Sequence, residues 1–131
     1  MPLPRLAKTV VLLADDNPDC ANSLALCLEL EGYHALVAYD GMKAVEVALA
    51  NRPSVVILDL GMPHLNGYGA ATKIRTAFGE RVLLIAYTAW GDDMARQRSK
   101  AAGFDHHVVK GRDDVEALLR VLAENCGSPV R

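Results

Sequence analysis

The sequence predicts an α/β protein built on a doubly wound parallel sheet of five strands. Short aliphatic runs rich in β-branched residues recur along the chain, and segments of helix length separate them. Such runs are typical of strands buried on both faces of a parallel sheet. The composition agrees, because 51% of the residues are hydrophobic and only 5% are aromatic, which favours an aliphatic, layered core. A length of 131 residues suits a single domain.

The predicted elements alternate as five strand–helix units. Strands are expected near residues 10–14, 34–38, 55–58, 82–86 and 106–109. Asn17 followed by Pro18 predicts an N-cap with proline at the first helical position, and Gly32 predicts the end of that first helix. A second helix is expected between the punctuation at Asp40-Gly41 and the break at 51–53, and further helices are expected at about 67–78, about 92–102 and around 115–122. The helix at 92–102 carries Met94 but otherwise only alanines as apolar residues, so we expect it to pack weakly and to be the most mobile element.

Charge and composition limit the class of protein. A net charge of −2 gives no reason to expect nucleic-acid binding, and no apolar stretch approaches the roughly 20 residues of a membrane span. The chain start lacks the pattern of a secretory signal, and three cysteines without framework spacing favour a reducing, cytoplasmic setting. Cys20 and Cys27 are expected to be buried on one face of the first helix. Residues 8–125 are expected to form the domain, with 1–7 as an arm and 126–131 as a tail.

Reactive side chains follow four of the predicted strands. Asp15 and Asp16 follow the first strand, Asp59 the third, Thr88 the fourth and Lys110 the fifth. Ligands of an open parallel sheet bind beyond the carboxyl ends of its strands. We therefore expect three carboxylates, a hydroxyl and an ammonium group to share one crevice.

This set of groups fits phosphoryl transfer to a carboxylate. Three carboxylates close together need a compensating cation, and hard oxygen ligands suit Mg²⁺, with Mn²⁺ as a substitute. Asp59 would attack phosphorus as the nucleophile, while Lys110 and Thr88 neutralise the remaining charge. Each residue alone has a simpler explanation, because Asp16 is placed to cap the first helix and Thr88 is of a type common in turns. The combination is what favours a site.

The ordered set of motifs resembles the receiver domain of bacterial two-component response regulators over about residues 8–125. The matching motifs are the acidic pair Asp15-Asp16, the phosphoacceptor loop Asp59-Leu60-Gly61-Met62-Pro63, the switch segment Tyr87-Thr88-Ala89, Lys110, and Asn66-Gly67 where the family more often has Asp-Gly. Stretches 89–92 and 102–107 are most similar to receivers fused to the end of hybrid sensor kinases.

The resemblance implies a fold, a reaction and partners. It implies a flavodoxin-like strand order of 2-1-3-4-5 and a metal shell completed by the backbone carbonyl of Gly61. It also implies a phosphoryl group taken from a histidine kinase or a histidine phosphotransfer protein, and catalysis limited to the domain's own phosphorylation and dephosphorylation. We expect a monomer or a weak dimer.

Two positions depart from the family pattern. The family lysine is normally followed by proline in a cis peptide bond, whereas Gly111 follows Lys110 here. His107 replaces the family's switch aromatic residue, three positions before the lysine. With Thr88 and Trp90 it makes up the expected switch residues, and the sequence leaves open whether Trp90 is buried or exposed.

Other functions would require residues different from those of a phosphoryl-accepting switch. A degenerate receiver that serves only as a docking module is the main alternative, and loss of an acid or of the lysine would indicate it. An aspartate-nucleophile phosphatase would carry a second acid two residues after the nucleophile, where Gly61 stands. A flavin carrier of this fold would need a loop rich in hydroxyl groups and glycine after the first strand, and Asp15-Asp16 would repel its phosphate.

Overall fold

The computed structural model describes residues 8–112 and 114–126 and contains the predicted doubly wound sheet. All five strands are parallel, in the order β2-β1-β3-β4-β5, which confirms the expected flavodoxin-like topology. Their bounds are β1 (Val10–Ala14), β2 (His34–Ala38), β3 (Val55–Leu58), β4 (Leu83–Thr88) and β5 (His106–Val109). The expected arm, 1–7, and positions 127–131 of the expected tail lie outside the described residues.

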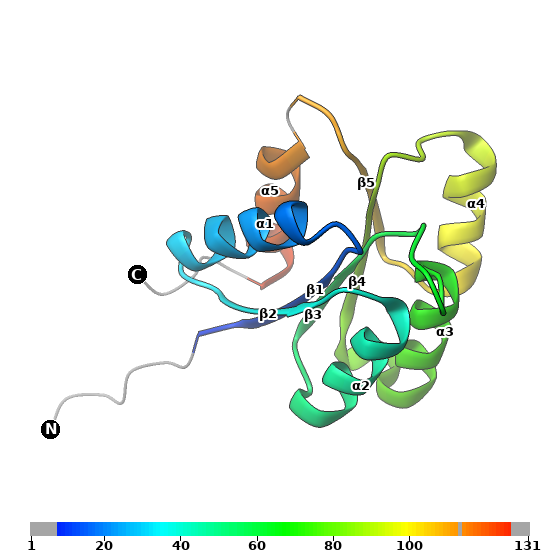
Figure 1. Ribbon diagram of the computed structural model, residues 1–131, viewed down its shortest axis with the longest axis horizontal. Helices are drawn as coiled ribbons and strands as arrows, with labels where there is room; N and C mark the ends of the chain where they lie inside the picture. The colour runs from blue at the N-terminus through cyan, green and yellow to red at the C-terminus, as the bar shows by residue number, and fades with distance from the viewer. Residues whose placement is uncertain (1–7, 113, 127–131) are drawn as a thin grey trace, which may run out of the picture.

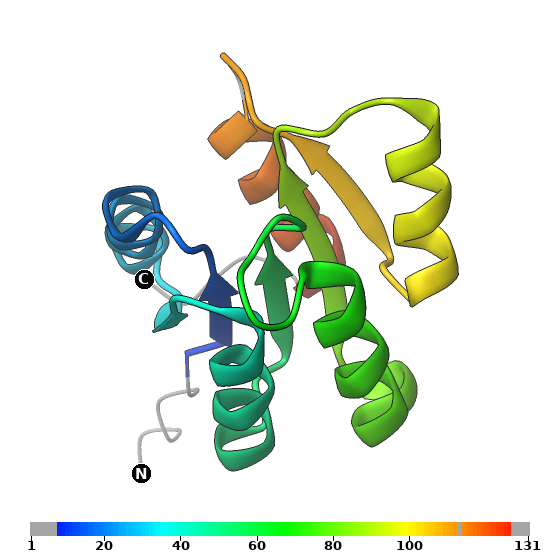
Figure 2. The same cartoon turned by 45° about the vertical axis from the view of Figure 1, so that its right-hand side comes forward.

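Five helices cover the two faces of the sheet. They are α1 (Pro18–Leu30), α2 (Gly41–Asn51), α3 (Gly67–Phe78), α4 (Asp93–Ala102) and α5 (Asp114–Cys126), with a short 3-10 helix η1 (Gly79–Arg81) after α3. Helices α1 and α5 lie on one face, and α2, α3 and α4 lie on the other (Figures 1 and 2). Helix α5 ends one residue beyond the predicted domain boundary at 125.

The core consists of two aliphatic layers separated by the sheet. Alternate residues of each strand point to opposite faces, so Leu12 packs under α2 and α3 while Leu13 packs under α1 and α5. Burial on both faces explains why the strands read as continuous apolar runs. In the described part of the chain, no helix combines the length and the apolar character needed to cross a membrane.

Side chains at the helix starts explain where the helices begin. The Asn17 carboxamide oxygen accepts hydrogen bonds from the backbone N–H groups of Asp19 and Cys20, as the sequence predicts. Asn66 caps α3 by accepting from the N–H of Gly69 at 2.9 Å. An asparagine at this position therefore has a structural explanation.

Two sequence predictions about the fold are wrong. β4 continues to Thr88 instead of ending near residue 86, because Tyr87 pairs with Val108 and Thr88 pairs with Val109 on β5. Cys20 is exposed and Cys27 only half-buried. The buried stripe of α1 consists of Ala21, Leu24 and Leu28, and Cys20 lies in the exposed first turn.

Helix α4 packs thinly, as its composition predicts. Its buried residues are Ala95 and Ser99, whereas Met94 is 70% exposed. Polar contacts to α3 supplement this packing, because the Arg98 guanidinium lies 4.1 Å from the ring centre of Tyr68. The expected mobility of α4 stays a prediction.

Candidate functional site

The strand register places two aspartates side by side at the carboxyl edge of the sheet. Ala14 at the end of β1 pairs with Leu58 at the end of β3. Asp15 and Asp59 directly follow these two strand ends, and the Asp59 N–H donates to the Ala14 carbonyl at 3.0 Å. The parallel sheet therefore brings together acids that lie 44 positions apart in the chain.

Asp16 joins this pair to form an acidic cluster. One carboxylate oxygen from each of Asp15, Asp16 and Asp59 lies within 4.8 Å of the others. Asp15 is buried, Asp59 is half-buried and Asp16 is exposed, so the cluster opens to solvent on one side. The cap of α1 is Asn17 and not Asp16, which leaves the Asp16 carboxylate available to the cluster.

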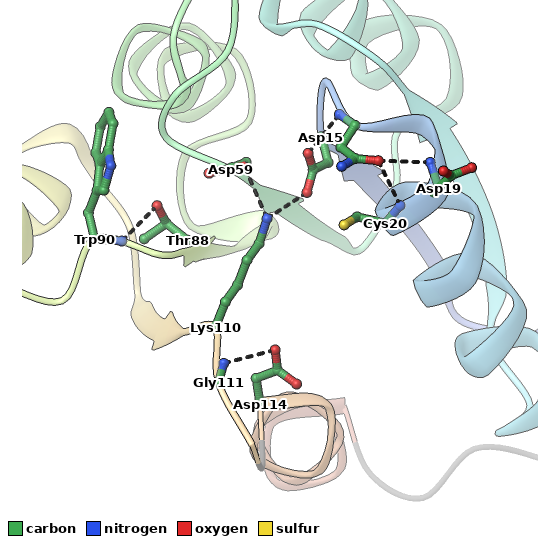
Figure 3. A network of polar contacts seen from close by, with 10 residues as sticks. Asp15, Asp19, Cys20, Asp59, Thr88, Trp90, Lys110, Gly111 and Asp114 are labelled. Carbon is green, nitrogen blue, oxygen red and sulfur yellow. Dashed lines mark hydrogen bonds and ion pairs between the residues drawn. The ribbon is translucent and has the colours of Figure 1, made fainter.

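Lys110 joins the cluster from the end of β5. Its ammonium group donates to Asp15 Oδ2 at 2.7 Å and to Asp59 Oδ2 at 3.1 Å (Figure 3). Partial burial by itself would lower the pKa of Lys110, but the hydrogen bonds and negative charges of the two aspartates outweigh it and raise that pKa. Lys110 is therefore charged at neutral pH.

The loop after β3 folds tightly around the third acid. The N–H of Gly67 donates to the Leu60 carbonyl at 3.0 Å, and a Cβ at Gly67 would overlap the backbone oxygen of Asp59. Only glycine allows this approach. Trp90 covers the same loop, because a Cβ at Gly61 would lie 3.1 Å from the indole ring. The indole is 47% exposed, so Trp90 is a partly exposed cover and not a core residue.

A chain of hydrogen bonds links the site to helix α4. Thr88 is 1% exposed, and its hydroxyl accepts from the Trp90 N–H at 3.3 Å (Figure 3). The Trp90 carbonyl accepts from His107 Nε2 at 2.7 Å, and His107 Nδ1 lies 2.8 Å from the Ser99 hydroxyl on α4. Because a carbonyl only accepts, Nε2 carries the proton in the neutral ring, and Nδ1 accepts from Ser99. His107 thus lies between the Trp90 loop and α4.

Sequence reasoning missed two polar residues beside Lys110. Tyr87 on β4 donates a hydrogen bond from its hydroxyl to the Asp114 carboxylate at the start of α5. Burial is the main cause that raises the pKa of Tyr87 far above its ordinary value, and the bond to Asp114 adds to it. A tyrosine inside an aliphatic strand, next to a predicted site residue, is the signal that could have indicated it.

A cavity of about 640 Å³ opens at the opposite edge of the sheet. Residues at the starts of the strands line it, among them Thr9, Ser54 and His106. It contains none of the residues predicted to act chemically. The acids and the lysine predicted to act chemically lie together at the carboxyl edge instead.

Comparison with known protein families identifies the kind of domain. The family model of the response regulator receiver domain matches residues 11–122. The chain belongs to this family. As a receiver domain it is a signalling module of two-component systems and not a turnover enzyme. The resemblance inferred from the motifs is confirmed.

Curated relatives share the receiver domain over most of this chain. An uncharacterised 14.6 kDa protein of Leptolyngbya boryana is 30% identical over 122 residues, which cover 92% of each chain. Response regulator ArlR of Staphylococcus saprophyticus is 32% identical over 88% of this chain, but the match covers only 51% of that protein. The chain spans about half the length of several such relatives.

Solved receiver domains have the same architecture. The receiver domain of sensor histidine kinase PA1611 from Pseudomonas aeruginosa is 32% identical, with a TM-score of 0.83 over 93% of this chain and 100% of that chain. That structure holds a magnesium ion in its active-site cleft. Chemotaxis protein CheY4 of Vibrio cholerae is 26% identical, with a TM-score of 0.82 over 90% of this chain and 98% of its own.

Proposed function

We propose that this receiver domain accepts a phosphoryl group on Asp59 from a phosphohistidine of a histidine kinase or a histidine phosphotransfer protein. The observation that carries the proposal is the position of Asp59, whose carboxylate lies beside Asp15 and accepts a hydrogen bond from Lys110. All the acids and the lysine expected of an active receiver are present, so nothing favours a degenerate docking module.

The acidic cluster fits a magnesium ion. With all three carboxylates ionised and Lys110 protonated, two negative charges remain without a counter-charge, and oxygen ligands suit Mg²⁺ or Mn²⁺. We assign the ligand set to Asp15, Asp16, Asp59 and the backbone carbonyl of Gly61. A bound Mg²⁺ would supply positive charge to the phosphoryl oxygens during transfer.

Asp59 acts as the nucleophile. One of its carboxylate oxygens forms a bond to phosphorus while the bond between phosphorus and the imidazole nitrogen of the donor breaks, and the imidazole leaves with the electron pair. Lys110 stabilises charge on the phosphoryl oxygens, and the Thr88 hydroxyl donates to one of them. The product is an aspartyl phosphate, and the same residues promote its hydrolysis by water.

The structural effect of phosphorylation is transmitted to the surface through Thr88, Trp90 and His107. When the Thr88 hydroxyl turns toward the phosphoryl group, the Trp90 N–H loses its acceptor. The Trp90 carbonyl remains bonded to His107, which contacts Ser99 on α4. A change at Thr88 therefore alters the surface formed by α4 and β5, and protein partners bind to this surface.

The setting of this exchange is also part of the proposal. The phosphoryl donor is a partner protein that carries a phosphohistidine. The exchange takes place in the cytoplasm, and the receiver works as a monomer or a weak dimer. Nucleic acid is not expected to bind this domain, because its net charge is −2.

Labelling of Asp59 tests the proposal. Acetyl phosphate with Mg²⁺ should add one phosphoryl group to the protein, as seen by intact-mass measurement, and Asp59→Asn should abolish the addition. Asp93→Asn, in the exposed first turn of α4, is the matched control and should be labelled like the parent. Full labelling of Asp59→Asn would overturn the assignment, and an unlabelled parent would favour the docking module.

A further inference from the structure

The segment after Lys110 lacks the proline that the receiver family normally has there. Gly111 takes that place, and the Lys110–Gly111 peptide bond is trans. On the strand side the lysine is anchored, because its backbone N–H donates to the Thr88 carbonyl at 2.8 Å. Glycine gives the other side more backbone freedom than any other residue. Something else must restrain Lys110 if its ammonium group is to stay between two carboxylates.

Asp114 restrains Gly111 by a hydrogen bond that a proline at this position could not form. Its Oδ2 atom accepts a hydrogen bond from the Gly111 N–H at 3.1 Å, and proline has no such donor (Figure 3). Its Oδ1 atom accepts from the Val115 N–H at the start of α5. The carboxylate therefore ties the residue next to Lys110 to the first turn of a packed helix.

Tyr87 closes the arrangement from β4. Its hydroxyl donates to the Asp114 carboxylate, and its ring centre lies 5.4 Å from the Lys110 ammonium. One tyrosine therefore contacts the lysine through its ring and holds the restraining aspartate through its hydroxyl. Lys110, Gly111, Asp114 and Tyr87 form a closed ring of contacts beside the acidic cluster.

We propose that Asp114, held by Tyr87, is a positioning residue that keeps Lys110 directed at Asp15 and Asp59, in place of the rigid proline of related receivers. The proposal rests on the function proposed above, since Lys110 has a catalytic role only if Asp59 is phosphorylated. It assigns to the start of α5 a role in the rate of phosphoryl transfer, besides capping the helix.

A purely structural role predicts a different result from a positioning role. If Asp114 only caps α5, the Tyr87 hydroxyl is dispensable, because the bond to the Val115 N–H does not involve it. If Asp114 positions Lys110, Tyr87→Phe removes a support of the ring of contacts while it keeps the aromatic face and the cap. This substitution therefore separates the two roles.

Phosphorylation kinetics of two variants test the proposal. Tyr87→Phe and Asp114→Asn should each slow labelling of Asp59 by acetyl phosphate on the order of tenfold, the lower end of what loss of an outer partner costs around a metal site. The Mg²⁺ affinity of both should match the parent, since neither residue belongs to the metal cluster. The Gly111 amide should become more mobile in ¹⁵N relaxation measurements.

Matched controls and a rescue complete the experiment. Tyr39→Phe removes a hydroxyl bonded to Asn22, away from Lys110, and should leave the rate unchanged. A Cβ at Gly111 would meet no atom within 4 Å. The proline ring of Gly111→Pro would take the place of the N–H that Asp114 accepts from, so the Asp114 carboxylate has to turn away in this variant. In the Gly111→Pro background the donor to Asp114 is gone and the backbone is stiff, so Asp114→Asn should no longer slow labelling.

The outcomes separate the two proposals. Parent-like rates and unchanged Gly111 mobility in both variants would overturn the positioning role while leaving phosphorylation of Asp59 intact. An equal loss of rate in Tyr39→Phe would also overturn it, because the effect would then be general. If the parent itself is not labelled, the proposed function fails, and Gly111 mobility still decides whether Asp114 restrains the loop.

Discussion

At the scale of single residues, the site depends on a balance of charge that each aspartate alters differently. Asp15 is buried and bonded to Lys110, Asp59 shares that lysine, and Asp16 is the exposed member of the cluster. Lys110 offsets only part of the negative charge. We therefore expect the cluster to attract a divalent cation and each acid to contribute to its affinity.

Removal of Asp16 should weaken metal binding without unfolding the protein. Asp16→Ala should lower Mg²⁺ affinity by at least about tenfold, because loss of even an outer partner commonly costs that much. Asp19→Ala, in the exposed first turn of α1, is the control and should keep the parent's affinity. Fluorescence of the nearby Trp90 during a Mg²⁺ titration is the measurement. Unchanged affinity in both Asp15→Ala and Asp16→Ala would rule out the site.

Protonation of Tyr87 should influence stability in alkaline solution. Its pKa is raised, first by burial and then by the bond to Asp114, so the unfolded chain releases the proton at lower pH than the folded protein does. The resulting stabilisation is complete below the ordinary pKa of about 10 and is lost as the pH rises above it. Urea unfolding between about pH 9 and 11 should therefore show a shallower decline for Tyr87→Phe than for the parent. Tyr39→Phe should decline as the parent does.

At the scale of elements, the β4–α4 connection and β5 form the part best placed to respond to phosphorylation. Helix α4 buries little apolar surface, and its contact with β5 includes the bond between Ser99 and His107. His107 also bonds to the Trp90 carbonyl, so one imidazole joins the loop after β4 to α4.

Replacement of His107 should alter the switch and spare the chemistry. His107→Phe removes the bonds to the Trp90 carbonyl and to Ser99, so the activated state should differ while the rate of labelling stays near the parent's. NMR shifts of residues 88–104 upon addition of beryllofluoride and Mg²⁺ are the readout. His106→Phe, next to it on β5 and in contact with Asn125, is the control. An activated spectrum like the parent's across about pH 6 to 8 would remove His107 from the switch.

At the scale of the whole molecule, two aliphatic layers hold the carboxyl edge of the sheet in register. Leu118 of α5 is fully buried in the layer between the sheet and helices α1 and α5, whereas Leu26 of α1 is 62% exposed. Any loosening of these layers would disturb all the site residues together, because they extend from the ends of paired strands.

Core and surface leucines should differ sharply in their effect on stability. Leu118→Ala should lower the free energy of unfolding by about 2–5 kcal/mol, since it leaves a cavity as well as losing apolar burial. Leu26→Ala should change it by less than about 0.5 kcal/mol. Chemical denaturation measures both. Similar losses in the two variants would contradict the two-layer description of the core.

The sequence by itself determined the fold class, the strand and helix order and the chemical identity of the site. Buried parallel strands appear in the sequence as apolar runs. Residues that follow such strands lie at one edge of the sheet, so the proximity of Asp15, Asp59 and Lys110 could be predicted. Local rules also located the helix starts, because the cap of α1 depends only on Asn17 and its neighbours.

Only the tertiary structure decided the contacts between elements distant in the chain. The length of β4 depends on its pairing with β5, and the exposure of Cys20 depends on how the first turn of α1 meets the sheet. The contacts of Tyr87 with Asp114 and of His107 with Trp90 join side chains that no local pattern relates. Sequence periodicity reports which face of an element is buried, whereas the partner that a polar side chain meets there depends on the packing of several elements at once.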